Sequence, residues 1–272
     1  MRVIELFEQD IKTIDRQSSK GNQLKWKSNK EWYKADFTGY EGLVEYIVSN
    51  LIKKSTLLEE EYVDYDLVKI KYNNHIYNGV ASIDFLSEDW QIVTLERLFQ
   101  SYFGKSLNNV IWKINGSEER LEFLVKSVEK ITGLKDFGKY MNKILTIDAF
   151  FLNEDRHTHN IAVLMNRKQE FMYCPIFDNG AALLADTNLD YPLVEDIYKL
   201  IEKVKSKTFS ESFLEQLEVS EKLYGLNLKL HFTKKDIEEL LSNEETFIYS
   251  KEVKERVKEV LFEQMRKYSY LF

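Results

Sequence analysis

The sequence predicts an α+β protein with a small β-rich lobe followed by a larger helical lobe. Alternating apolar and polar residues with turn signals dominate residues 1–90, whereas apolar residues at helical spacing dominate the remainder. Only two prolines and ten glycines occur in 272 residues, which favours helices over long irregular linkers. We expect the lobes to span residues 1–88 and 89–272, with their boundary near "LSEDWQ".

The β-rich lobe is predicted from three segments. Residues 23–37 alternate around the turn signal "KSNK" and predict a hairpin. Residues 39–55 carry apolar side chains at a spacing typical of an amphipathic helix, with two lysines near the end that suit the helix dipole. Residues 66–86 predict two further strands joined at "NNH".

The helical lobe is predicted from apolar residues at helical spacing over 92–103, 118–132 and 136–152. Two short strands, 161–165 and 170–174, are expected inside it. From about residue 192 the pattern is helical again, and the last helix is expected over 251–268 with its charges on a solvated face.

Composition limits the classes of partner and location. The net charge of −7 does not favour nucleic acid as the main partner. The single cysteine, Cys174, excludes an intrachain disulfide and a cysteine-based zinc site, and it is typical of a reducing cytoplasm. Acidic residues in the first ten positions argue against a signal peptide, and no apolar run reaches the roughly 18 residues of a membrane span. We therefore expect a soluble cytoplasmic protein.

The stretch "FLNEDRHTHNIAVL" gathers polar side chains between two apolar runs. It contains Asp155 and Asn160, and a second acid, Asp178, follows the two short strands in "PIFDNG". Carboxylate and amide oxygens are the ligands that Mg²⁺ or Mn²⁺ prefers. Phosphoryl transfer uses this set, with one carboxylate orienting a hydroxyl and an Asn/Asp pair holding metal on the phosphates.

The same segments resemble a known family. "DRHTHN" followed by "PIFDNG" resembles the Asp-x-His-x-x-Asn and Asp motifs of HipA-like kinases, and the Asp-Arg-His-x-x-Asn motif of the related phosphoinositide 3/4-kinases. "SSKGNQLKWK" (18–27) resembles the Ser-x-Gly-x-Gln-x-Lys phosphate loop of the HipA group. "WYKADF" is similar to its nucleotide-lysine strand, and "EYIVSNLIK" (45–53) to its helix beginning Glu-Tyr. These pieces follow the family order over residues 15–180, whereas the C-terminal helices carry no matching motif.

The resemblance implies a two-lobed protein-kinase-like fold, with ATP and Mg²⁺ (or Mn²⁺) as cofactors. It implies a catalytic carboxylate at Asp155, assistance in proton transfer from His157, and metal ligands at Asn160 and Asp178. Lys34 would contact the α- and β-phosphates. The triphosphate would lie under the backbone of Ser18, Ser19, Lys20, Gly21 and Asn22. The adenine would meet the backbone near Ser82, Ile83, Asp84 and Phe85.

The partner of Lys34 has two candidates on the helix that follows its strand. Glu41 and Glu45 lie one turn apart, and such a pair of acids destabilises an isolated helix unless a cation compensates. The motif favours Glu45, whereas the helical wheel places Glu41 nearer the apolar stripe, so both remain candidates. Arg156 likewise has two interpretations, a phosphate ligand or a partner of Glu154.

The sequence departs from familiar kinase patterns at two places. The order is Asp-Arg-His, so His157 follows the carboxylate, and its unperturbed pKa of about 6.5 permits proton transfer. Asn179 rather than a phenylalanine follows Asp178, so the resemblance does not extend to a Phe-based activation-loop switch.

We therefore expect an ATP- and Mg²⁺-dependent phosphotransferase, a HipA-like Ser/Thr protein kinase capable of autophosphorylation. Its substrate would be a protein with a Ser or Thr hydroxyl, its own Thr13, Ser18 and Ser19 being the first positions to inspect. Three alternatives stay open. One is a nucleotide-binding module of a toxin–antitoxin-like assembly with an antitoxin-like protein partner. The second is a lipid kinase of the phosphoinositide type. The third is a metal-dependent hydrolase using His157 and His159 with Asp155 and Asp178.

Overall fold

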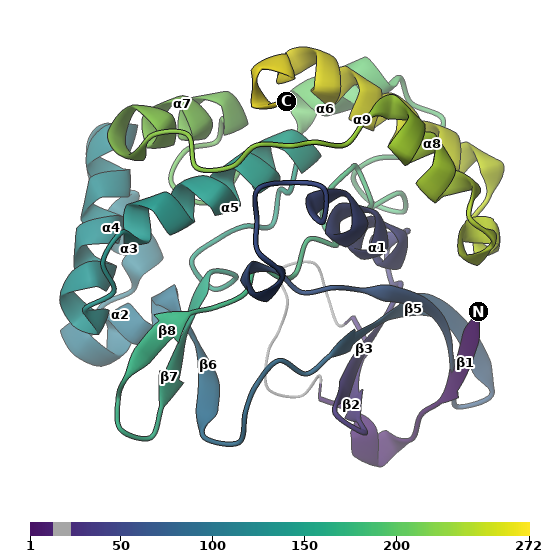
Figure 1. The fold of residues 1–272 in the computed structure, drawn as a ribbon, viewed down its shortest axis with the longest axis horizontal. Coiled ribbons are helices and arrows are strands. Elements are labelled where there is room, and N and C mark those ends of the chain that lie inside the picture. Colours follow the sequence, from purple (N-terminus) through teal and green to yellow (C-terminus); the bar gives the residue numbers. More distant parts are fainter. Residues whose placement is uncertain (13–22) are drawn as a thin grey trace. The chain divides into compact units, whose positions relative to one another are not determined.

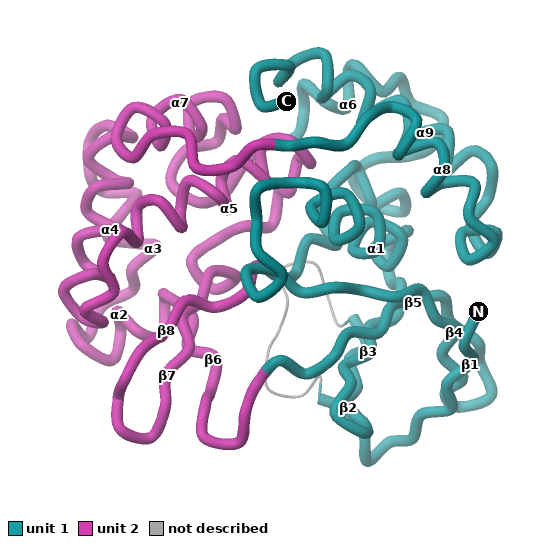
Figure 2. Tube along the Cα trace, viewed as in Figure 1, with its two compact units in different colours: residues 1–85, 177–204, 230–272 teal, residues 86–176, 205–229 magenta. Residues whose placement is uncertain are grey.

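The computed structural model describes residues 1–12 and 23–272 (Figure 1). Within these residues the chain forms two compact units (Figure 2). Unit 1 comprises residues 1–85, 177–204 and 230–272, and unit 2 comprises residues 86–176 and 205–229. The sequential lobes 1–88 and 89–272 stay a prediction. The predicted phosphate-loop residues Ser18, Ser19, Lys20, Gly21 and Asn22 lie outside the described part of the chain, as does Thr13.

Unit 1 contains a five-stranded sheet in the order β1-β4-β5-β3-β2. Its strands are β1 (Arg2–Glu5), β2 (Lys25–Ser28), β3 (Glu31–Ala35), β4 (Asp66–Tyr72) and β5 (His75–Ile83). All neighbours pair antiparallel except β1 and β4, which are parallel. The predicted hairpin and the two predicted strands are confirmed. Strand β1 was not predicted, because its short edge segment is mostly exposed and shows no buried alternation.

The turn between β2 and β3 sets the register that brings two lysines side by side. Asn29 and Lys30 have φ of 51° and 64°, the left-handed conformation that a two-residue hairpin turn of this twist requires. The resulting register pairs Lys25 with Lys34. Because directly paired residues on neighbouring strands point to the same face, both lysines leave the sheet on one side.

Helix α1 (Glu41–Ile52) packs on this sheet, contacting β3, β4 and β5 (Figure 1). Its apolar stripe is fully buried, as the spacing predicted. Gly79 of β5 permits the close approach of β3, since a Cβ there would lie 2.2 Å from the backbone oxygen of Lys34. Strand β3, which carries Lys34, is therefore held both by its close pairing with β5 and by the packing of α1.

The rest of unit 1 is the stretch 177–204 and the C-terminal helices. Their bounds are α6 (Ile197–Lys203), α8 (Lys234–Ser242) and α9 (Lys251–Lys267), with short 3₁₀ turns at Glu8–Asp10, Glu59–Glu61, Glu244–Ile248 and Ser269–Leu271. Arg256 of α9 is buried and donates to the backbone oxygens of Tyr191 and Pro192 at 2.5 and 2.6 Å. Tyr40, just before α1, donates its hydroxyl to the oxygen of Leu183 at 2.7 Å. These bonds fasten the stretch after Asp178 to the unit.

Unit 2 combines a three-stranded antiparallel sheet, in the order β6-β7-β8, with helices (Figure 1). The elements are β6 (Trp90–Thr94), β7 (Ala162–Asn166), β8 (Phe171–Tyr173), α2 (Leu95–Phe103), α3 (Leu107–Ile111), α4 (Ser117–Thr132), α5 (Phe137–Phe151) and α7 (Phe213–Tyr224). The predicted helix from residue 92 was wrong at its start. Residues 90–94 pair with β7, and Thr94 caps α2 by accepting from the backbone N–H of Arg97.

Helix α5 forms the centre of unit 2 and packs against α4 and α7. Nearly all of its residues are buried, among them Met141, Ile144 and Phe150. The α+β composition predicted from the sequence is confirmed, with a sheet in the N-terminal part and mostly helices in the C-terminal part. None of the helices in the described ranges is both long and apolar enough to cross a membrane.

Candidate functional site

Lys34 of β3 is the centre of a buried charge cluster in unit 1. Its Nζ donates to Glu45 Oε1 at 2.6 Å and to Asp178 Oδ1 at 2.7 Å. The side chains of Lys34 and Glu45 are only 13% and 2% exposed. Burial works against the charged ammonium, but the carboxylates of Asp178 and Glu45 outweigh it and hold the pKa of Lys34 well above its usual value. The lysine is therefore a fixed, permanently charged cation.

The two candidate partners of Lys34 have different roles in the structure. Glu45 binds Lys34 with one carboxylate oxygen, and with the other it accepts from the backbone N–H of Asn179 at 2.9 Å. Glu41 instead accepts from the backbone N–H groups of Thr38 and Gly39 at 2.7 and 3.2 Å. These N–H groups precede α1, so Glu41 fixes the turn that leads into the helix. The structure thus joins Glu45, and not Glu41, to the lysine.

Asp178 sits at a turn of unusual backbone conformation. Its φ is 62°, in the left-handed region that Asp and Asn tolerate better than most residues. Besides Lys34, its carboxylate meets Lys25 of β2, whose Nζ lies 3.9 Å from Oδ2. Lys25 was not among the predicted site residues. It is the lysine that ends the Ser-x-Gly-x-Gln-x-Lys pattern, so the signal was present in the sequence.

Tyr65 also belongs to this cluster and was not predicted. The Lys34 ammonium donates to the Tyr65 hydroxyl at 3.4 Å and lies 5.1 Å from the centre of its ring. Burial, together with the charge of Glu45, raises the pKa of Tyr65 far above its usual value, so the hydroxyl stays neutral. Nothing in the periodicity of the sequence distinguishes this tyrosine from an ordinary core residue.

The residues predicted to meet an adenine lie at the end of β5 and just after it: Ser82, Ile83, Asp84 and Phe85. The Asp84 carboxylate is bound by Lys27 at 2.6 Å and by the indole N–H of Trp32 at 3.2 Å. The ring of Phe85 lies 6.3 Å from that of Phe177, centre to centre. These contacts fix the segment, and its proposed contact with a nucleotide stays a prediction.

In unit 2 the loop after α5 is built around a buried arginine. Arg156 is 2% exposed, and its Nε donates to both carboxylate oxygens of Asp148 at 3.1 Å. Its Nη1 donates to the backbone oxygen of Asn160 at 3.1 Å. Burial, opposed by the charge of Arg156, raises the pKa of Asp148 to about 6. Neither sequence interpretation of Arg156 included this partner, and the guanidinium serves to brace the loop.

Two further bonds hold the loop in place. The hydroxyl of Thr158 donates to Glu96 Oε2 at 2.8 Å, and the hydroxyl of Thr208 donates to the backbone oxygen of Arg156 at 2.6 Å. Thr158 belongs to the loop itself, Glu96 to α2, and Thr208 to the segment that follows residue 204. A loop with so many buried bonds holds its polar side chains in one geometry.

Asp155 and Asn160 face each other within this loop. The Asn160 amide nitrogen donates to the backbone oxygen of Asp155 at 2.8 Å and to its carboxylate Oδ2 at 3.1 Å. Because the nitrogen makes both bonds, the amide oxygen Oδ1 is left as an acceptor. An amide oxygen held in this way suits a hard metal ion.

Two side chains that can carry positive charge lie close to Asp155. His157 Nε2 and Lys207 Nζ lie 3.7 and 3.8 Å from Asp155 Oδ1. Burial lowers the pKa of His157 even though the Asp155 charge opposes it, so the imidazole is neutral near pH 7. His159 is exposed, and its ring lies 5.5 Å from that of His157. Lys207 was not predicted, because nothing in its neighbourhood in the sequence links it to the motif.

The described residues contain no group of three His, Cys, Asp or Glu side chains arranged to hold a metal ion.

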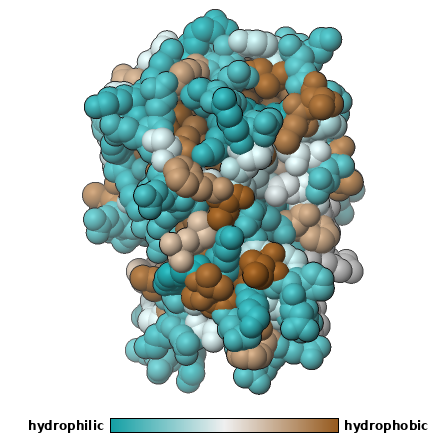
Figure 3. All heavy atoms as spheres, turned by 90° about the vertical axis from the view of Figure 1, so that its right-hand side faces the viewer, coloured by the Kyte–Doolittle hydropathy of each residue, from teal (hydrophilic) through white to brown (hydrophobic). Residues whose placement is uncertain are grey.

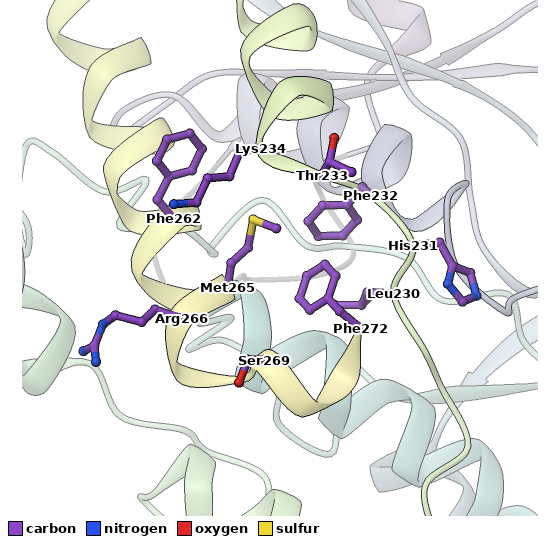
Figure 4. A pocket seen from close by; sticks show the side chains of 10 residues that line it. All are labelled: Leu230, His231, Phe232, Thr233, Lys234, Phe262, Met265, Arg266, Ser269 and Phe272. Atoms are coloured by element: carbon purple, nitrogen blue, oxygen red, sulfur yellow. The ribbon is translucent and has the colours of Figure 1, made fainter.

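An open cavity of about 630 Å³ lies elsewhere in unit 1, beside the C-terminal helices (Figure 4). Its lining includes Phe232, Lys234, Phe262, Met265 and Phe272, and none of the described site residues. The face shown in Figure 3 is largely hydrophilic with separate apolar patches.

No protein-family model matches the chain, and no curated protein matches it by sequence. A solved structure does resemble it over almost its whole length. The Helicobacter pylori proinflammatory kinase CtkA superposes with a TM-score of 0.65 at 18% identity, over 98% of this chain and 96% of that chain. The chain therefore has a kinase-like fold, and the predicted fold class is confirmed. HipA of Shewanella oneidensis MR-1, solved with HipB and operator DNA, gives a TM-score of 0.43 at 15% identity over 88% of this chain and 58% of that chain.

Proposed function

We propose that this protein is an ATP- and Mg²⁺-dependent phosphotransferase of the HipA-like type, acting on a Ser or Thr hydroxyl of a protein and capable of autophosphorylation. The observation that carries the proposal is the buried cluster of Lys34, Glu45 and Asp178, with both ion pairs below 3 Å. It occurs in a chain whose fold resembles that of a kinase. Unit 2 of the same chain also contains the hydrogen-bonded pair Asp155 and Asn160.

The Lys34 cluster has the properties that phosphate binding requires. Phosphoryl transfer is catalysed mainly by positioned positive charge, because there is little covalent chemistry for the protein to perform. Glu45 fixes the ammonium in place, so the cation loses little rotational freedom when phosphate oxygens arrive. Lys25 brings a second positive charge to Asp178, the other acid that binds Lys34.

Asp155 is the proposed acceptor of the substrate proton. The oxygen of the acceptor hydroxyl forms a bond to the γ-phosphorus, the bond from that phosphorus to the bridging oxygen of ADP breaks, and the hydroxyl proton passes to the Asp155 carboxylate. Asn160 orients this carboxylate through its amide nitrogen. The neutral His157 imidazole, 3.7 Å from the same carboxylate, is suited to take the proton onward.

The proposed metal ligands are Asn160 through its amide oxygen and Asp178 through its carboxylate. Both are hard oxygen donors, and the Asp178 side chain is partly exposed. When bound, Mg²⁺ or Mn²⁺ supplies neutralisation of the phosphate charge. The proposed partner is a protein substrate, with an antitoxin-like protein as a further partner. The proposed location is the cytoplasm, in keeping with the single buried Cys174.

The test is incubation of the purified chain with Mg²⁺ and γ-labelled ATP, followed by mass spectrometry of the labelled peptides. Wild type is expected to label itself on serine or threonine, and Asp155→Asn to lose about 100- to 10,000-fold of the rate, the usual contribution of a positioned general base. Equal labelling of Asp155→Asn and wild type would refute the assignment. Stabilisation by ATP without any labelling would favour the nucleotide-binding module, and labelling of added phosphoinositide alone would favour the lipid kinase.

A further inference from the structure

Lys207 brings a positive charge to the proposed catalytic carboxylate from a distant part of the sequence. Its Nζ lies 3.8 Å from Asp155 Oδ1, and its side chain is 43% exposed while that of Asp155 is 15% exposed. Both residues belong to unit 2. The ammonium is therefore in contact with the acid and still open to solvent.

The segment around Lys207 is held by hydrogen bonds on both sides of the lysine, one of them to the loop that carries Asp155. The Thr208 hydroxyl donates to the Arg156 backbone oxygen at 2.6 Å. Phe209 is fully buried, and its backbone oxygen accepts from Arg120 at 3.0 Å. Ser206 donates its hydroxyl to the backbone oxygen of Ser210 at 2.7 Å. A tightly bonded segment thus presents one half-exposed lysine to the acid.

Stability alone does not account for this arrangement. Half-exposed ion pairs at nearly 4 Å contribute little to folding, because solvent screens them and the lysine loses side-chain entropy. A charge placed in this way has a more direct use in the proposed reaction. A phosphoryl group that approaches Asp155 brings negative charge toward a carboxylate, and a cation beside the carboxylate offsets their repulsion.

We propose that Lys207 is a further phosphoryl-binding residue of the transfer reaction. Its ammonium has three donors, and besides the contact with Asp155 it binds oxygens of the group in transfer and holds that group against the acceptor hydroxyl. This inference rests on the proposed function of Asp155. It assigns to the segment after residue 204 a role that no motif in the sequence indicates.

The chain offers a matched control two positions away. Lys205 lies on the same segment, is 64% exposed, and forms a local ion pair with Glu211 at 2.5 Å. Removal of its charge tests the effect of one lost surface lysine without touching Asp155.

The experiment compares Lys207→Met, Lys207→Arg and Lys205→Met in autophosphorylation with Mg²⁺ and labelled ATP over a range of ATP concentrations. We expect Lys207→Met to lower the maximal rate about 100-fold, the usual effect of removing one preorganised donor to developing charge. Its half-saturating ATP concentration and its thermal unfolding should stay near those of wild type. Lys207→Arg should recover most of the rate, and Lys205→Met should behave as wild type.

Several results would overturn the inference. A Lys207→Met variant with the wild-type maximal rate would do so, including one in which only the half-saturating ATP concentration rises. Equal losses in Lys207→Met and Lys205→Met would do so as well. If Asp155→Asn is inactive while Lys207→Met is fully active, the inference fails and the proposed function stands. If the wild type, Asp155→Asn and Lys207→Met all become labelled equally, or if none of them becomes labelled, the proposed function itself fails.

Discussion

The charged clusters of the two units differ in how closely their ions are paired. In unit 1, Lys34 is bound by two carboxylates at 2.6 and 2.7 Å and is almost completely buried. In unit 2, Asp155 meets His157 and Lys207 only at 3.7 and 3.8 Å. Short, buried ion pairs fix a charge for binding, whereas longer contacts leave a carboxylate able to take up a proton. In the proposed reaction, unit 1 would therefore serve phosphate binding and unit 2 proton transfer.

Each unit also contains a buried acid that positions residues next to its charged cluster. In unit 2 this acid is Asp148, which braces Arg156. In unit 1 it is Asp36, which accepts from the backbone N–H of Gly42 at 2.6 Å and from the Tyr249 hydroxyl at 2.9 Å. The first neutralises a buried charge, and the second positions the start of α1. Substitutions of Asp148 and Asp36 should therefore change the unfolding free energy in different ways.

The largest change in stability is expected from Asp148→Asn. The substitution leaves the Arg156 guanidinium buried at 2% exposure without its acid, and an uncompensated buried charge costs about 3–5 kcal/mol of unfolding free energy. Chemical denaturation of wild type and variant measures the difference. Glu118→Gln, which removes a surface acid paired with Lys222, is the control and should unfold close to wild type. Similar losses for the two variants would contradict the bracing role of Arg156.

A smaller and more specific effect is expected from Glu45→Gln. Loss of the carboxylate removes one of the two short ion pairs that fix the Lys34 ammonium. We expect labelling from ATP to fall about 10-fold or more, the effect of one lost charge-assisted bond. Glu41→Gln is the matched control on the same helix, because Glu41 binds the turn before α1 and does not pair with Lys34. It should lower the melting temperature slightly and leave the labelling rate of the folded protein unchanged. The opposite pattern would show that the helical wheel, and not the motif, had identified the partner.

The last effect concerns pH. Burial, with the nearby charge of Glu41, raises the pKa of Asp36 to about 7. Between about pH 4, where an unfolded Asp ionises, and about pH 7, the folded state keeps a proton that the unfolded chain has lost. The unfolding free energy contributed by this group therefore falls as the pH rises through that window. Chemical denaturation at several pH values should show that the unfolding free energy falls less steeply with pH in Asp36→Asn than in wild type. The fall that remains in the variant includes the contribution of Asp148, whose pKa is also raised. Identical slopes in variant and wild type would count against the burial of the Asp36 charge.

Sequence reasoning identified local features well and distant contacts poorly. The spacing of apolar residues located α1, α4, α5 and the hairpin of β2 and β3, because their periodicity reflects one buried face. It misread residues 92–94, because Ile92 and Val93 also fit the spacing of the helix that follows. A strand that pairs with residues 162–166 is stabilised by contacts that no local window contains.

The candidate site shows the same division. Short motifs placed Lys34, Glu45 and Asp178 in one set, and the structure brings these three within hydrogen-bonding distance. Asp148 and Lys207 were missed, because they reach Arg156 and Asp155 only through the fold of unit 2. The choice between Glu41 and Glu45 could not be made from a helical wheel, since both lie on one edge of α1 and only the position of β3 separates them.

The proposed transfer reaction is tested most directly by measuring ATP binding and phosphate transfer in the same preparations of wild type and Asp155→Asn. Isothermal titration with Mg²⁺ and ATP gives the dissociation constant, and intact mass after incubation gives the phosphate gained. We expect the variant to bind ATP with nearly the wild-type dissociation constant, because the Lys34 cluster is untouched, and to gain no phosphate. A variant that gains phosphate at the wild-type rate, or a wild-type protein that does not bind ATP, would contradict it.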